Sequence, residues 1–118
     1  MDAPEPIAMR LNESADVLTV EFEDGASFEL SAEYLRVCSP SAEVQGHGHG
    51  QATLQTGKKN VKIKRVDPVG EYAVSIRFDD AHSTGIYTWD YLYALGGEYD
   101  TRWKEYLEEL AKAGASRE

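Results

Sequence analysis

The sequence predicts an α+β domain in which an antiparallel sheet is built from two halves, each a hairpin followed by a short helix. Two stretches alternate apolar and polar residues on both sides of turn-forming dipeptides, which is the period of half-buried strands. After each stretch, a serine or threonine precedes a short apolar segment with an acidic residue in its first turn, a pattern typical of a capped helix. A final stretch repeats apolar residues every three or four positions, which predicts a C-terminal amphipathic helix.

The first half turns at Asp24-Gly25, where glycine accepts the positive φ that tight hairpins require. Ser31 follows the return strand and is expected to cap a short helix, with Glu33 in its first turn. The elements expected in this half are strands at 7–11, 17–23 and 27–30 and a helix at 32–36.

A long glycine-rich loop is expected over residues 41–59, because the stretch is rich in Gly, Gln, Ser and Thr and has no regular period. In the second half we expect a turn at 67–70, and Thr88 as the cap of a helix that Gly96-Gly97 ends. Tyr72, Val74, Ile76 and Phe78 are expected to face inward. The elements expected here are strands at 60–66, 72–78 and 83–87, a helix at 89–95 and a longer helix at 98–113.

The two halves also resemble each other in sequence. The pattern Ser31-x-Glu33-Tyr34-Leu35 after the first hairpin corresponds to Thr88-x-Asp90-Tyr91-Leu92 after the second. Two copies are too few for a repeat array. We therefore expect an antiparallel sheet with helices packed on one face.

Size and composition indicate one folded domain. A chain of 118 residues with 42% hydrophobic and 28% charged residues is long enough to bury a core of its own. We expect residues 1–6 to be disordered, 7–96 to form the domain, and 97–118 to form a C-terminal helix with a frayed tail. The single cysteine and the absence of a signal-peptide pattern favour a cytoplasmic protein.

The net charge of −9 disfavours several classes of partner. Such a chain repels phosphate backbones and anionic membrane surfaces. No apolar run reaches the roughly 20 residues that a membrane-spanning helix requires. We therefore expect neither nucleic acid nor a membrane as partner.

Four stretches together carry a family resemblance: residues 22–25 (FEDG), 35–44 (LRVCSPSAEV), 45–48 (QGHG) and 84–92 (TGIYTWDYL). They resemble the gamma-butyrobetaine-hydroxylase-like N-terminal domain family, which includes small bacterial proteins long described as a domain of unknown function. The resemblance implies an α+β domain that occurs alone, in front of the catalytic domain of gamma-butyrobetaine and trimethyllysine dioxygenases, and attached to iron–sulfur-cluster carrier ATPases of plastids.

In the dioxygenases, the resemblance implies a zinc-holding, dimer-supporting domain with three cysteines and one histidine as ligands. The histidine matches His82, but the cysteines fall near Ser39, Ser41 and Val44. Three of the four implied ligands are therefore replaced. The iron site of the oxygenases is not expected either, because no His-x-Asp or His-x-Glu element occurs and the chain is too short for their barrel.

The scarce metal-ligating side chains still suggest a site. His47 and His49 form a His-Gly-His element, and His82 and Cys38 are the further candidate ligands. Imidazole and thiolate suit zinc, iron and similar divalent metals. The competing interpretation is that all three histidines are solvated loop and turn residues.

Other single features have more than one interpretation. Cys38 is either a nucleophile near a histidine or a small buried hydrophobic residue. The glycines at 46, 48 and 50 lack the strand, helix and lysine of a phosphate-binding loop. The apolar stripe that contains Trp103 and Tyr106 either covers the sheet or contacts a partner. A further aromatic set forms either a core or a cage for a quaternary ammonium group: Tyr34, Tyr72, Tyr87, Trp89, Tyr91 and Tyr93.

The leading functional prediction is a non-enzymatic accessory or protein-interaction module, an adapter in iron or iron–sulfur metabolism. The alternative is a small metal-binding protein that uses the loop histidines in a degenerate form of the family zinc site. A protein partner is expected and a homodimer is left open. The expected partner surface consists of Arg36, Ser39, Ser41, Glu43, Gln45 and His47.

Overall fold

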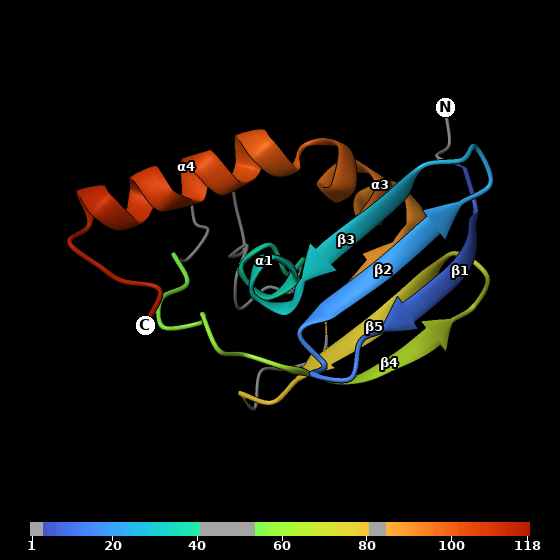
Figure 1. The fold of residues 1–118 in the computed structure, drawn as a ribbon, viewed down its shortest axis with the longest axis horizontal. Helices are drawn as coiled ribbons and strands as arrows, with labels where there is room; N and C mark the ends of the chain where they lie inside the picture. Colours follow the sequence, from blue (N-terminus) through green and yellow to red (C-terminus); the bar gives the residue numbers. More distant parts are fainter. Residues whose placement is uncertain (1–3, 41–53, 81–84) are drawn as a thin grey trace.

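Two three-stranded antiparallel sheets and three helices make up the computed structural model of this chain, which describes residues 4–40, 54–80 and 85–118 (Figure 1). The sheet orders are β1-β2-β3 and β4-β5-β6. The predicted α+β class is confirmed, with each half of the chain forming its own sheet. The strands are β1 Pro6–Leu11, β2 Val17–Phe22, β3 Ser27–Ser31, β4 Ile63–Val69, β5 Ala73–Phe78 and β6 Gly85–Thr88.

Both sheets contribute to one hydrophobic core. In β2 the alternating side chains Leu18, Val20 and Phe22 are buried, as their period predicts. In β5, Ile76 and Phe78 are buried in the same cluster. The helices gather along one side of the sheets (Figure 1), so the core lies between these layers.

The structure corrects the predicted turn at 67–70. β4 continues through Pro68 to Val69, and the turn follows it. Pro68 is tolerated because β4 is an edge strand of its sheet, where a missing backbone N–H leaves no internal ladder bond unmade.

The inward position expected for Tyr72 is wrong. Tyr72 is 56% exposed and precedes β5, whereas the neighbouring Ala73 is fully buried. The hairpin therefore turns later than its sequence suggests, and Tyr72 lies outside the core.

The helices are α1 Ala32–Val37, α3 Trp89–Gly97 and α4 Tyr99–Lys112. Both predicted caps are present: the backbone N–H of Tyr34 donates to the Ser31 hydroxyl, and that of Tyr91 donates to the Thr88 hydroxyl. α3 extends through both glycines at its end, two residues beyond the predicted stop. Among the described helices, none is long and apolar enough to cross a membrane.

The two halves exchange equivalent hydrogen bonds. The Tyr34 hydroxyl in α1 donates to the Leu95 carbonyl in α3, and the Tyr91 hydroxyl in α3 donates to the Cys38 carbonyl after α1. The two donors, Tyr34 and Tyr91, are 57 positions apart, and so are the two acceptors, Cys38 and Leu95. The sequence similarity of the two halves thus corresponds to a reciprocal packing of their helices.

Both ends of the described chain are more ordered than the sequence suggests. Pro6 already pairs with Phe22 in β1, one residue before the predicted boundary. The C-terminal tail, expected to fray, makes backbone hydrogen bonds from Gly57 to Ser116 and from Lys59 to Arg117. The tail is therefore held beside the segment that precedes β4.

Candidate functional site

A charged cluster joins the end of α1 to the end of β5. Arg36 Nε lies 2.8 Å from Asp80 Oδ2, and Lys58 Nζ lies 2.7 Å from the same oxygen. The Arg36 side chain is 7% exposed, and its Nη1 atom makes no hydrogen bond within the described part of the chain. Two cations therefore converge on one carboxylate in a largely desolvated position.

The pKa of Asp80 reflects two opposing effects. Burial by itself raises this pKa, but the hydrogen bonds and charges of Lys58 and Arg36 together outweigh burial and hold the pKa below its usual value. Asp80 is consequently ionised at neutral pH, as this cluster requires.

A close contact beside the cluster joins two further parts of the chain. Ser39 is fully buried, and a Cβ placed on Gly85 would lie 2.7 Å from the Ser39 hydroxyl oxygen. Only glycine leaves room for this approach. The described residues that flank segments 41–53 and 81–84 are thereby brought together.

These positions revise the expected partner surface. Arg36 and Ser39 are 5% and 0% exposed, so both lie inside the fold and neither offers a contact surface. Their burial follows from the ion pair with Asp80 and the close approach to Gly85. The other four predicted contact residues, Ser41, Glu43, Gln45 and His47, lie outside the described residues.

Of the four candidate metal ligands, the structure describes only Cys38. His47, His49 and His82 fall in the segments outside the described residues. Within the described ranges, no three His, Cys, Asp or Glu side chains are grouped closely enough to hold a metal ion. The metal site stays a prediction from the sequence.

Cys38 lines a polar cleft of about 580 Å³. Burial raises the pKa of its thiol to about 11, although nearby Arg102 acts in the opposite direction. At neutral pH the sulfur is therefore protonated, and it lacks the thiolate character that a nucleophile needs. The other lining residues are Val37, Pro40, Tyr91, Arg102 and Glu109.

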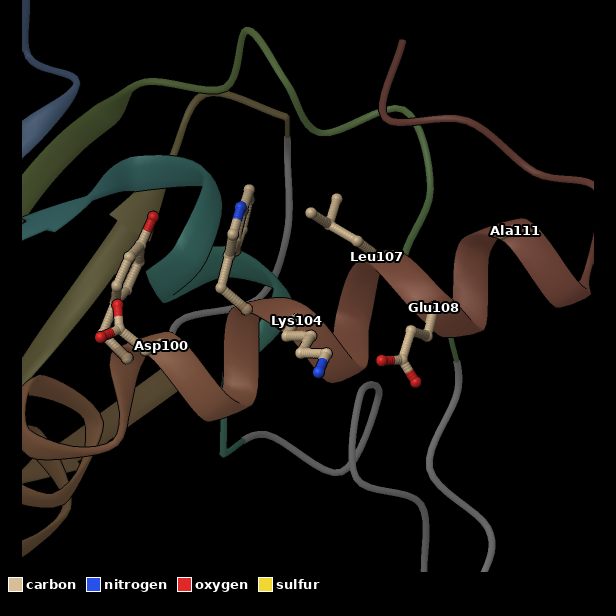
Figure 2. A pocket seen from close by; sticks show the side chains of 7 residues that line it. Asp100, Lys104, Leu107, Glu108 and Ala111 are labelled. Carbon is tan, nitrogen blue, oxygen red and sulfur yellow. The ribbon is translucent and has the colours of Figure 1, made fainter.

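An apolar groove of about 430 Å³ runs along one flank of α4 (Figure 2). Its apolar wall repeats at every fourth position, and Leu107 within it is 40% exposed. The charged residues Asp100, Lys104 and Glu108 lie next to this wall. The apolar wall consists of Tyr99, Trp103, Leu107 and Ala111.

The same side of the helix also reaches the core, since Tyr106 and Leu110 are 8% and 4% exposed and Tyr99 and Trp103 pack partly against the core cluster. The apolar stripe predicted from the sequence therefore divides between covering the core and lining a groove. The period of the sequence predicts an apolar face, but only the packing of α4 on the rest of the fold decides which of its residues stay accessible.

The aromatic set packs into or against the core, with the exception of the exposed Tyr72, and does not form a cage. Tyr34 and Tyr87 are fully buried, and their hydroxyls donate to the carbonyls of Leu95 and Leu35. Tyr93 packs edge-on against Phe22 at a centroid distance of 5.0 Å. Such rings have no open face for a cationic ligand.

Residues 9–93 match the family model of the gamma-butyrobetaine hydroxylase-like N-terminal domain. The chain belongs to this family. The match covers both hairpin-plus-helix halves and ends before α4, so the groove lies outside the part of the chain that defines the family.

Solved structures are also similar to this family member. Two NMR solution structures are 49% and 47% identical to the chain, each with a TM-score of 0.83 and 98% coverage of this chain, and 90% and 86% coverage of their own. This coverage includes α4. No curated protein matches the chain significantly.

A third similar structure is the crystal structure of a protein of unknown function from Acidithiobacillus ferrooxidans, which belongs to the DUF971 family. It is 38% identical, with a TM-score of 0.65, 78% coverage of this chain and 92% of its own. Family membership thus establishes the domain type and leaves its role to be inferred from the site.

Proposed function

We propose that this family member is a non-enzymatic protein-interaction module that docks a partner through the groove on α4. The observation that carries the proposal is the accessible apolar wall around Leu107. Removing such surface from water contributes roughly 25 cal/mol per Å² toward a complex, before the costs of association are subtracted. Tyr99 and Trp103 also pack partly against the core, whereas Leu107 and Ala111 are exposed and leave the outer part of the wall accessible.

The charges favour a cationic partner segment. Two of the three charged residues along the groove are acidic, Asp100 and Glu108, and the whole chain carries a net charge of −9. A partner that offers apolar side chains with flanking lysine or arginine matches this surface in both respects. Complementary charge raises the association rate and excludes acidic competitors.

Site-specific photocrosslinking tests the docking surface. A photoreactive residue at Leu107 should capture a partner protein, whereas one at Ile86, 49% exposed on β6, should not. Excess unlabelled protein should compete for the captured partner, and the Leu107→Glu variant should fail to compete, because a charge in the apolar wall opposes burial. Equal capture from both positions, or equal competition by Leu107→Glu, would contradict the proposal.

An adapter role in iron or iron–sulfur metabolism remains the family-based expectation for the partner's identity. The alternative is a metal-binding protein using His47, His82, His49 or Cys38. The adjacency of Ser39 and Gly85 supports it, because these residues flank the two histidine-bearing segments.

Calorimetric titration with zinc or ferrous iron separates the alternatives. A stoichiometric site that is lost in His47→Ala and in His82→Ala would favour the metal-binding protein. Weak binding that is the same in the wild type, His47→Ala and His82→Ala would rule out the metal-binding protein. Neither outcome depends on the α4 groove.

A further inference from the structure

Arg117 in the C-terminal tail makes an unusually complete set of contacts. Its Nε and Nη2 atoms lie 2.7 and 2.6 Å from the two carboxylate oxygens of Glu33. Its Cζ atom lies 5.3 Å from the centroid of the Trp103 ring. One guanidinium is therefore held both by a bidentate ion pair and by an aromatic face.

The acceptor side of this arrangement is fixed and buried. The Glu33 side chain is 6% exposed and belongs to the capped first turn of α1. Trp103 is packed at 6.2 Å, edge-on, against the fully buried Tyr34. The 6% exposure is that of Glu33 with Arg117 in place, and a carboxylate in such a position is costly without a cation.

The occupant is more exposed than its acceptor. The Arg117 side chain is 38% exposed, and its tail follows Gly114, whose φ of +64° ends the helical course of α4. The tail also makes backbone hydrogen bonds with Leu110, Gly57 and Lys59. Lys59 and Glu118, which are 43% and 71% exposed, form a surface ion pair. Such exposed pairs contribute little to stability.

The chemistry of the site selects a guanidinium. The planar fork of arginine matches both carboxylate oxygens and stacks on an indole ring, whereas an ammonium group offers one point charge. Cation–π contact with tryptophan adds to this preference.

We propose that Glu33 and Trp103 form a binding site for an arginine side chain of the partner, and that Arg117 fills this site while no partner is bound. Trp103 also lines the α4 groove, so the groove and the arginine site share one side chain. The partner's identity as an arginine-bearing segment rests on the proposed docking function. The arginine site itself does not.

Chemical rescue in the full-length Arg117→Ala variant tests the site, with N-acetyl-arginine amide as the probe. The readout is the indole N–H resonance of Trp103 in two-dimensional NMR, with Trp89, whose indole donates to the Glu71 carbonyl, as an internal control. We expect a saturable shift of the Trp103 signal alone. The affinity should be about tenfold higher than for the wild type, because tethered Arg117 competes at an effective concentration on the order of millimolar.

N-acetyl-lysine amide is the matched probe and should bind about tenfold more weakly. Arg117→Lys keeps the positive charge beside Glu33 and serves as a second host if Arg117→Ala does not fold. In this second host, the arginine probe should displace the tethered ammonium group more readily than it displaces Arg117 in the wild type. Absence of a saturable Trp103 shift in both variants, or equal binding of both probes, would overturn the site.

Adding Glu33→Gln to Arg117→Ala removes the carboxylate together with its cation and should abolish arginine binding. Unchanged binding would place the probe elsewhere and overturn the site. The outcomes also separate the two proposals: arginine binding without partner capture from Leu107 sustains the site and removes the docking groove. Capture from Leu107 without arginine binding sustains the docking groove and removes the arginine site.

Discussion

Single side chains connect parts of this chain that are distant in sequence. Arg36 and Asp80 are 44 positions apart, and their ion pair fixes the end of α1 against the end of β5. Because the Arg36 side chain is 7% exposed, removing one partner of this pair is expected to cost more than removing a partner of an ion pair at the surface.

Asp80→Asn should destabilise the protein by about 3 kcal/mol, because it leaves the Arg36 charge buried without its carboxylate. Urea denaturation followed by circular dichroism measures this change. Asp67→Asn is the matched control, since Asp67 pairs with Arg65 at the surface, with side chains 45% and 71% exposed. It should change stability by roughly 0.5 kcal/mol or less.

The Asp80→Asn variant also predicts how the stability of the protein depends on pH. Because the pKa of Asp80 is lowered in the folded protein, its ionised form stabilises the fold at neutral pH. That contribution is lost as the pH falls below the ordinary value of 3.8. The stability difference between wild type and Asp80→Asn should therefore shrink in acid, and a constant difference would show that Asp80 does not act through its charge.

At the scale of helices, α1 and α3 each begin at a capping side chain, at equivalent positions of the two halves. Ser31 and Thr88 each accept a backbone N–H three residues ahead, at 3.0 and 3.1 Å. The capped helices α1 and α3 then exchange the tyrosine hydrogen bonds that join them. Local capping thus places the donors of the long-range contacts.

Ser31→Ala and Thr88→Ala should each cost about 1 kcal/mol, because each leaves one helix N–H without its acceptor. Thermal unfolding of the two single variants measures the loss. Thr101→Ala, exposed within α4, removes a hydroxyl with no capping role and should not destabilise. A comparable loss in all three variants would contradict a capping effect.

At the scale of the whole molecule, the first sheet and α3 meet at a glycine. A Cβ placed on Gly96 would collide with the Phe28 ring. Phe28 in turn packs edge-on against Phe22 and Tyr93. The approach of α3 to β3 therefore depends on a missing side chain.

Gly96→Ala should destabilise the protein by about 1–3 kcal/mol, because the added methyl overpacks the contact with Phe28. Gly97→Ala is the matched control, since a Cβ there meets nothing within 4 Å. It should be neutral or stabilise slightly through better helix propensity. Chemical denaturation compares the two, and equal effects would show that the contact with Phe28 is not the cause.

Much of the fold could be predicted from local pattern. The alternation around Leu18, Val20 and Phe22 identified a half-buried strand, and Ser31 and Thr88 marked helix starts correctly. The turn near Pro68 was misplaced because an edge strand tolerates proline, and edge positions follow from strand order and not from local sequence.

The candidate site was far less predictable. The sequence singled out Cys38 as a candidate ligand or nucleophile and Arg36 as part of a partner surface, but burial makes the first a protonated thiol and holds the second within an ion pair. It carried no signal for the pairing of Arg117 with Glu33, which are 84 positions apart. Arginine and glutamate are both common residues, so only their contact in the folded structure identifies this pair.

By itself, the sequence determined the class of the domain, its family and the periodic faces of its elements, because these depend on neighbours within a few positions. The tertiary structure decided which apolar flank of α4 stays accessible, which carboxylate is buried, and that the C-terminal tail supplies its cation. Those properties depend on contacts between distant segments, and burial and charge pairing take effect only once packing has excluded water.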